Sequence, residues 1–182
     1  MRTLDLFPTQ IHLSTCDLDL NDLENACYEH KNKNKSAVIS NKGGYQGHNF
    51  YYEPLIEQIA TCFPQRDDKK LKEFSSNMWV NINKKGDWND IHDHDPYAGT
   101  ALSGVFYVKT PVNCGKIRFY DPRQFVTKAP DMKYYNDGNH YHYIDPQPNL
   151  LIIFPGWLKH SVEPNLSDQD RISVSFNIKF IF

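Results

Sequence analysis

The spacing of apolar residues follows a helical period in the first part of the chain, residues 1–73. Apolar side chains recur every three or four positions in residues 18–33 and again in residues 53–63. A short strand with a proline near its start is expected within residues 4–17, and a glycine-rich turn at residues 41–47. We therefore expect residues 1–73 to form a helical N-terminal layer.

From residue 74 onward the pattern changes from helical to alternating. Short runs in which every second residue is apolar are bounded by Gly, Pro, Asn and Asp, which favour turns. The expected strands are residues 77–83, 101–108, 115–121, 141–145, 149–154 and 171–182. Several short strands with turns between them predict a β-sandwich or jelly roll. The expected fold class is mainly β with N-terminal helices, with the jelly-roll core in residues 74–182.

Composition adds a few limits to this expectation. The chain of 182 residues lacks a linker-like stretch, which favours a single domain over residues 1–182. A net charge of −2 argues against a protein that mainly binds nucleic acid. Neither a secretory signal nor an apolar run of membrane-spanning length is present, and the 4 cysteines form no CxxC pair. We expect a cytoplasmic protein with reduced thiols and no membrane partner.

In "NDIHDHDPYAGT", residues 89–100, two histidines and three aspartates fall within the first seven residues, 89–95. If this stretch is extended, His92 and His94 point to one side and can share a metal ion, while Asp93 points away. His160, in "FPGWLKHSVEP", is the best candidate for a third ligand. The plainer interpretation, a solvated polar loop, is favoured on spacing alone.

Other histidines show how readily such spacing arises. His140 and His142 form a second pair two residues apart, which we interpret as a rim strand facing substrate or as an inert strand. His12, His30 and His48 have no partner pattern. We interpret these three as surface residues or as polar residues with ordinary hydrogen-bond partners.

The C-terminal run "RISVSFNIKF" alternates between polar and apolar side chains. Its polar face holds an arginine, two hydroxyls and an amide, namely Arg171, Ser173, Ser175 and Asn177. An arginine fork beside a hydroxyl suits a small carboxylate, because two parallel charge-assisted hydrogen bonds can form. Taken alone, this run favours the plainer interpretation, the exposed polar side of an antiparallel strand.

Together these pieces resemble the Fe(II)- and 2-oxoglutarate-dependent oxygenases of the prolyl-hydroxylase-like superfamily. The similarity is closest to a group found in bacteria and phages, with motifs W-x-N-x-x-x-x-G-D-x-N-x-x-H-x-H, L-S-G-V-x-Y-V, D-P-R, F-P-x-W-L-x-H and R-x-S-x-S-F-N. This chain carries them in order as "WVNINKKGDWNDIHDH", "LSGVFYV", "DPR", "FPGWLKH" and "RISVSFN". The resemblance covers residues 77–178. It implies a double-stranded β-helix, which is a cupin-like jelly roll, with Fe(II) as cofactor and 2-oxoglutarate as co-substrate.

The resemblance also implies roles for single residues. His92 and His160 match the two metal-binding histidines. Arg171 matches the arginine that binds the distal carboxylate of 2-oxoglutarate, with Ser173 as its hydroxyl partner and Tyr107 at a position that reaches the same carboxylate. A donor to the metal-bound end of the co-substrate is expected on the preceding strand, from either Asn81 or Asn83.

One position departs from the usual pattern of two histidines and a carboxylate. Position 94 is histidine where aspartate is expected, and in an extended strand Asp93 and Asp95 face away. We expect His92, His94 and His160 to bind the metal, with Asp93 or Asp95 orienting a ring N–H. A bend near the following proline makes Asp95 an alternative third ligand.

The leading functional hypothesis is an oxygenase that uses 2-oxoglutarate and O₂, releases succinate and CO₂, and hydroxylates a C–H bond of an unidentified primary substrate. A jelly-roll binding module without turnover is one alternative. A cupin-like dioxygenase with three histidines that does not use 2-oxoglutarate is another, and Arg171 and Ser173 count against it.

Overall fold

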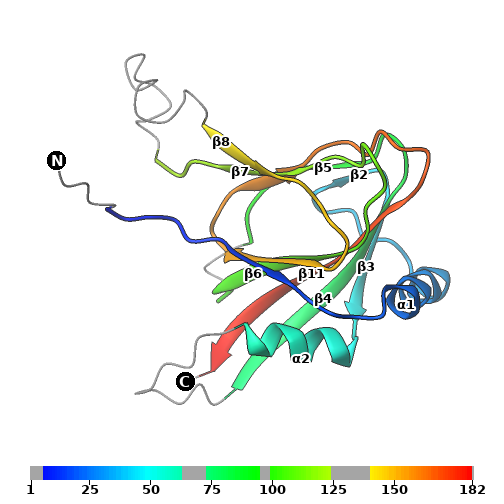
Figure 1. Cartoon of the computed structure of the whole chain (residues 1–182), viewed down its shortest axis with the longest axis horizontal. Coiled ribbons are helices and arrows are strands. Elements are labelled where there is room, and N and C mark those ends of the chain that lie inside the picture. Colours follow the sequence, from blue (N-terminus) through cyan, green and yellow to red (C-terminus); the bar gives the residue numbers. More distant parts are fainter. Residues whose placement is uncertain (1–5, 63–72, 95–98, 124–139, 182) are drawn as a thin grey trace.

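Two antiparallel sheets face each other in the computed structural model, which describes residues 6–62, 73–94, 99–123 and 140–181 (Figure 1). The larger sheet has, in spatial order, the strands β1 (His12–Thr15), β9 (Leu150–Pro155), β6 (Leu102–Lys109), β11 (Arg171–Ile181), β4 (Glu73–Asn83) and β3 (Tyr45–Phe50). The smaller sheet has β2 (Asn41–Lys42), β5 (Trp88–His92), β10 (His160–Val162), β7 (Ile117–Tyr120) and β8 (Tyr141–Ile144). This arrangement confirms the expected jelly-roll architecture.

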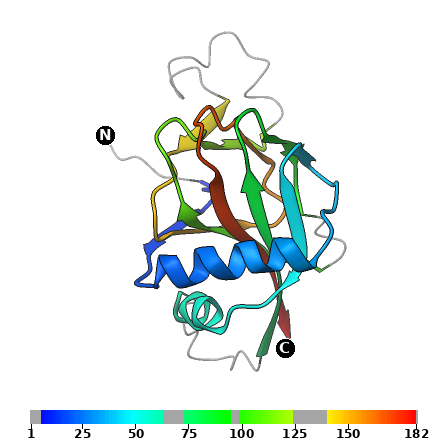
Figure 2. The ribbon, with the colours of Figure 1, turned by 90° about the vertical axis from the view of Figure 1, so that its right-hand side faces the viewer.

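Two helices cover the outer face of the larger sheet, α1 (Leu20–Lys33) and α2 (Glu53–Thr61), and Figure 2 shows α1 lying across its strands. The carboxylate of Asp19 caps α1 by accepting hydrogen bonds from the backbone N–H groups of Asn21 and Asp22. Proline stands in the first turn of α2, where its missing N–H is tolerated. Among the described residues, no helix has the length and apolar character needed to cross a membrane.

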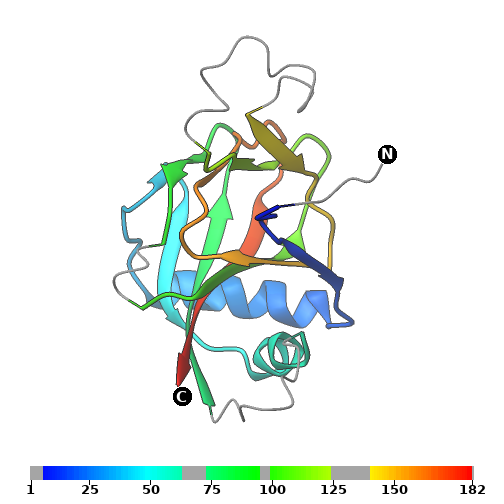
Figure 3. The same ribbon diagram turned by 90° about the vertical axis from the view of Figure 1, so that its left-hand side faces the viewer.

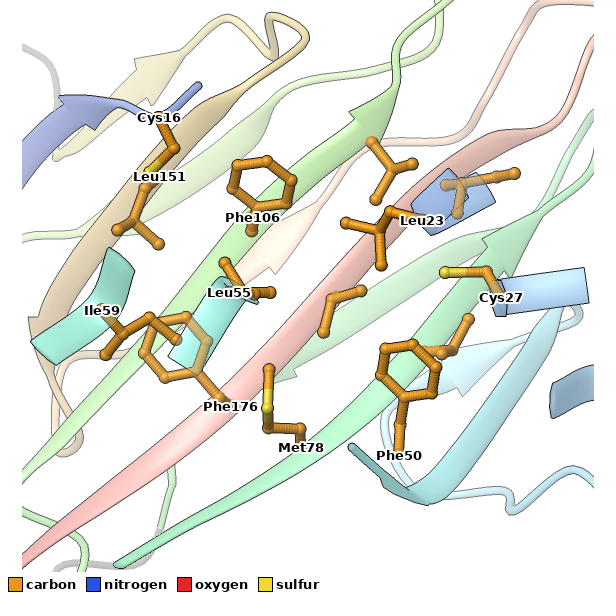
Figure 4. Close-up of a cluster of buried hydrophobic side chains, with 14 of the residues drawn as sticks. Cys16, Leu23, Cys27, Phe50, Leu55, Ile59, Met78, Phe106, Leu151 and Phe176 are labelled. Atoms are coloured by element: carbon orange, nitrogen blue, oxygen red, sulfur yellow. The ribbon is translucent and has the colours of Figure 1, made fainter. Parts of the chain in front are cut away.

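The main hydrophobic core lies between these helices and the larger sheet (Figure 4). α1 contributes Leu23 and Cys27, and α2 contributes Leu55 and Ile59, all of them fully buried. They pack against the apolar face of the sheet, where Phe176 of β11 is also fully buried. Burying one such side chain contributes about 1.5–3 kcal/mol, so this layer stabilises the sheet whose opposite face carries the polar residues.

Figure 3 shows the larger sheet between the two helices and the smaller sheet. The inner face of the larger sheet is polar along its central strands. β11 pairs with β4 in a continuous register, which sets polar residues of the two strands side by side. The pairs on this face are Arg171 with Asn83, Ser173 with Asn81, Ser175 with Trp79, and Asn177 with Asn77. The alternation predicted for the C-terminal run is therefore correct, and its polar side faces the smaller sheet.

The structure differs from the expectation in residues 41–50. The turn expected over residues 41–47 is shorter in the structure and consists of Gly43 and Gly44. Their φ values are 73° and 70°, which glycine adopts without strain. On either side of it lie β2 and β3, so the N-terminal part contributes strands as well as helices. The sequence "YQGHNF" does not predict β3, because only its two end residues are apolar and its pairing partner β4 lies far along the chain.

Candidate metal centre and co-substrate site

Three histidines converge between the two sheets. His92 ends β5 and pairs in register with His160 at the start of β10, and His94 follows β5 after a single residue. One ring nitrogen from each lies within 4.8 Å of the others. The ring centroids of His92 and His160 are 4.3 Å apart, and those of His94 and His160 are 5.1 Å apart. The structure thus brings together all three predicted ligands.

Hydrogen bonds orient two of the rings in the same way. Nδ1 of His92 lies 2.7 Å from the backbone oxygen of Asp90, and Nδ1 of His160 lies 2.9 Å from that of Leu158. A carbonyl oxygen only accepts, so each Nδ1 carries the proton and donates it. Nε2 of each ring then keeps a free lone pair, which is the form of histidine that binds a metal.

The third ring is oriented by an amide from the opposite sheet. Nδ1 of His94 lies 2.5 Å from Oδ1 of Asn177, which also accepts a hydrogen bond of 2.8 Å from the hydroxyl of Ser103. We expected Asp93 or Asp95 in this role. Asp93 is exposed, and the ring partner is Asn177 instead, while Asp95 lies outside the described residues.

Burial keeps the three histidines neutral. It lowers the pKa of His94 to about 4, with a smaller contribution from the neighbouring His92. Burial also lowers the pKa of His92, and that of His160 lies well below its usual range. Phe154 and Phe119 flank His160, with ring centroids at 4.7 and 6.0 Å, and exclude water from it. Neutral imidazoles at neutral pH are competent ligands for Fe(II), so the donor set fits a divalent transition metal.

The same cavity, of about 260 Å³, is lined by the three histidines and by Arg171. This arginine is 1% exposed. Its Nη1 donates to the backbone oxygens of Cys114 at 2.5 Å and Glu163 at 3.0 Å, while its buried Nη2 has no hydrogen-bond partner among the described residues. Because buried charged donors are rarely left unpaired, Arg171 is suited to a carboxylate ligand.

The remaining predicted residues surround Arg171 or continue along the cavity wall. Tyr107 and Ser173 are register partners on β6 and β11, and both line the cavity. Burial raises the pKa of Tyr107, so its hydroxyl stays protonated and can donate. Asn81 and Asn83 line the same cavity, and Nδ2 of Asn81 donates to the hydroxyl of Ser175 at 2.9 Å.

Of the other histidines, His48 alone among those described differs from the interpretation made from the sequence. His140 lies just before β8 and His142 lies within it, and both are outside the group of three. His12 is exposed and His30 bonds the backbone oxygen of His48, as interpreted from the sequence. His48 itself was misjudged, because it lines the cavity and its Nε2 is buried without a partner among the described residues.

Residues 77–177 match the model of a protein family described as "Putative 2OG-Fe(II) oxygenase". The chain belongs to this 2OG-Fe(II) oxygenase family. Membership makes the protein an oxygenase with Fe(II) as cofactor and with 2-oxoglutarate and O₂ as co-substrates. A comparison with curated proteins found no match.

Solved structures similar to this oxygenase share its fold at low sequence identity. A prolyl-4-hydroxylase from Pseudomonas putida aligns with a TM-score of 0.67 at 15% identity, over 96% of this chain and 94% of the other. A prolyl hydroxylase from Trichoplax adhaerens, in complex with a hypoxia inducible factor peptide, aligns with a TM-score of 0.64 at 12% identity, over 93% of this chain and 83% of the other. HygX from Streptomyces hygroscopicus, with nickel and 2-oxoglutarate bound, aligns with a TM-score of 0.62 at 9% identity, over 96% of this chain and 84% of the other. The expected double-stranded β-helix is thereby confirmed.

Proposed function

We propose that this oxygenase hydroxylates a C–H bond of its primary substrate, with His92, His94 and His160 holding Fe(II) and Arg171 holding 2-oxoglutarate. One observation carries the proposal: three histidines, whose Nδ1 hydrogen bonds leave Nε2 free, share a cavity with a buried arginine. Nη2 of this arginine has no hydrogen-bond partner in the part of the chain that the structure describes. Metal ligands and an anion-binding group therefore lie together in a space that a small dicarboxylate can enter.

The three histidines supply neutral ligands only. Three neutral imidazoles leave the full 2+ charge on the metal, which favours binding of an anionic co-substrate beside it. The Nδ1 hydrogen bonds to Asp90, Leu158 and Asn177 hold the rings so that Nε2 of each faces the others. When bound, the iron supplies the activation of O₂ that is coupled to oxidative decarboxylation of 2-oxoglutarate.

The opposite end of the co-substrate is assigned to the arginine region. Nη2 of Arg171 donates to the distal carboxylate, Ser173 adds a hydroxyl from the same strand face, and Tyr107 adds its protonated phenol. The two backbone carbonyls that accept from Nη1 hold the guanidinium in place. Asn81 and Asn83 are the proposed donors to the metal-bound end, and both face the cavity from β4.

The test is succinate release from purified protein supplied with Fe(II), 2-oxoglutarate and O₂. Slow release without primary substrate is expected from the parent and from His142→Ala, and it should be lost in His160→Ala. Fe(II) binding with no succinate would favour a dioxygenase that does not use 2-oxoglutarate, and absence of both would favour a binding module. A cytoplasmic location stays a prediction from the sequence.

A further inference from the structure

A second group of polar side chains lines the cavity from the edge strand β3. Gln46 and His48 are two residues apart, so they lie on the same face of the strand. Their register partners on β4 are Asn81 and Trp79, which line the same cavity. Neither Gln46 nor His48 has a role in the metal or co-substrate sites, and both lie outside residues 77–177, which match the family.

Each of these two side chains carries a buried polar atom. Oε1 of Gln46 and Nε2 of His48 have no hydrogen-bond partner among the described residues, and Gln46 is only 4% exposed. Buried polar atoms are nearly always hydrogen-bonded, because an unpaired one costs free energy. Oε1 of Gln46 accepts, and Nε2 of His48 donates in the tautomer that carries the proton there, so the two side chains suit a ligand that supplies an N–H donor and a carbonyl acceptor.

A stack of rings connects this pair to the metal ligands. The ring of His48 stacks on that of Trp79, with centroids 5.9 Å apart and planes at 22°. Trp79 in turn stacks on His94, at 5.5 Å and 26°. The ring of Trp79 alone therefore separates His48 from His94, so a group bound by Gln46 and His48 lies in the same cavity as the three histidines.

The charge of the wall limits what this pair can bind. Among the described residues that line the cavity, Asp93 and Arg171 carry the formal charges. Arg171 is assigned to 2-oxoglutarate, and Asp93 is exposed. The wall formed by Gln46, His48 and Trp79 offers neither a cation for an anionic group nor an anion for a cationic one.

We propose that Gln46 and His48 form a substrate subsite for a neutral carboxamide group. Gln46 accepts from the N–H of this group through Oε1, and His48 donates to its carbonyl through Nε2. This assignment rests on the proposed function, because the histidines beside Trp79 must hold the iron for the bound group to be a substrate. It names the substrate class of that site.

Three probes of similar size and different charge test the assignment. Benzamide, benzoate and benzylammonium are titrated by calorimetry into protein that holds Fe(II) and 2-oxoglutarate without oxygen, and into metal-free protein. Benzamide is expected to bind at least tenfold more tightly than the other two. No binding of benzamide to the parent, or equal binding of all three probes, overturns the carboxamide subsite.

Variants show whether the two residues are responsible. Gln46→Leu and His48→Phe are expected to weaken benzamide binding about tenfold each, because each removes one hydrogen bond to the ligand. The matched exposed controls, Gln147→Leu and His142→Phe, are expected to match the parent. Gln46→Glu keeps the size of the side chain and should shift the preference toward benzylammonium, a reversal that misfolding cannot produce.

The two proposals fail in different ways. Unchanged benzamide binding in both Gln46→Leu and His48→Phe, with Fe(II) and 2-oxoglutarate bound as in the parent, overturns the subsite alone. If the parent binds neither Fe(II) nor 2-oxoglutarate, yet benzamide binding to the metal-free protein responds to these substitutions, the proposed function falls and the carboxamide site remains.

Discussion

Nδ1 of His94 donates to Oδ1 of Asn177 across 2.5 Å, a hydrogen bond that joins the two sheets at the metal centre. Asn177 belongs to β11 of the larger sheet, whereas His94 follows β5 of the smaller one. The amide oxygen is itself held by the hydroxyl of Ser103 on the neighbouring strand. The orientation of one proposed ligand therefore depends on correct packing of the sheets against each other.

Asn177→Ala is expected to weaken Fe(II) binding about ten- to a hundredfold, because the ring of His94 loses the acceptor that fixes its tautomer. Asn177→Asp keeps an acceptor in the same place and should restore most of the affinity. Metal titration of the oxygen-free protein measures both. The matched control is Asn77→Ala, which removes the register partner of Asn177 and should bind Fe(II) like the parent. Equal affinity in all four proteins would contradict a positioning role.

The three-histidine assignment predicts a ranking of variants. His92→Ala and His160→Ala should abolish Fe(II) binding, because each removes a ligand atom from the group of three. His94→Asp should retain binding, since it supplies the carboxylate of the usual triad. The same titration measures the series.

Two further histidines serve as controls for this ranking. His140→Ala and His142→Ala should bind Fe(II) like the parent, because both residues lie outside the group of three. The reverse ranking would refute the assignment. Unchanged affinity in His94→Ala, together with loss in Asp95→Ala, would make Asp95 the third ligand.

Much of this site could be predicted because its residues lie on strands with regular alternation. The period of two in β11 placed Arg171, Ser173 and Asn177 on one face, and the spacing of His92 and His94 placed both rings on one side. The predicted helices also formed, because their apolar residues had a helical period and Pro54 stood in a first turn.

What could not be predicted depends on contacts between segments far apart in the chain. β3 has apolar residues only near its ends, and its strand conformation comes from pairing with β4. The partnership of His94 with Asn177 spans 83 positions. Nothing in the local sequence separated Asn177 from Asp93 or Asp95 as the partner, because only the packing of the two sheets decides which oxygen meets the ring.

The lowered histidine pKa values predict a pH dependence of stability in the metal-free protein. Burial lowers the pKa of His94 to about 4, from about 6.5 in an unfolded chain. Between these values the unfolded state binds more protons, so the free energy of unfolding should fall as the pH decreases from about 6.5 toward 4. Urea unfolding at several pH values measures this slope.

His94→Asn serves as the comparison for that slope, because it removes one of the titrating groups. The free energy of unfolding of this variant should fall less steeply below about pH 6.5. A parent whose stability is constant over this range, or a variant with an identical slope, would show that His94 does not titrate in this way.

The last prediction concerns Arg171, whose guanidinium is buried and whose Nη2 has no hydrogen-bond partner within the described ranges of the chain. If it binds the distal carboxylate of 2-oxoglutarate, Arg171→Ala removes a fixed cation from a dianionic ligand in a site with little water. Affinity for 2-oxoglutarate should fall by about 2–5 kcal/mol. Fe(II) binding should change little, because the metal ligands are other residues. Calorimetric titration of 2-oxoglutarate into the metal-loaded, oxygen-free protein measures this.

Arg171→Lys provides the graded comparison. A lysine keeps the charge but replaces a two-pronged fork with a point charge, so it should recover only part of the lost affinity. It also gives up one of the two hydrogen bonds to the backbone oxygens of Cys114 and Glu163 if its ammonium turns toward the ligand. Parent-like affinity in Arg171→Ala would show that the guanidinium serves the packing of these loops alone, and 2-oxoglutarate would then have to be held elsewhere in the cavity.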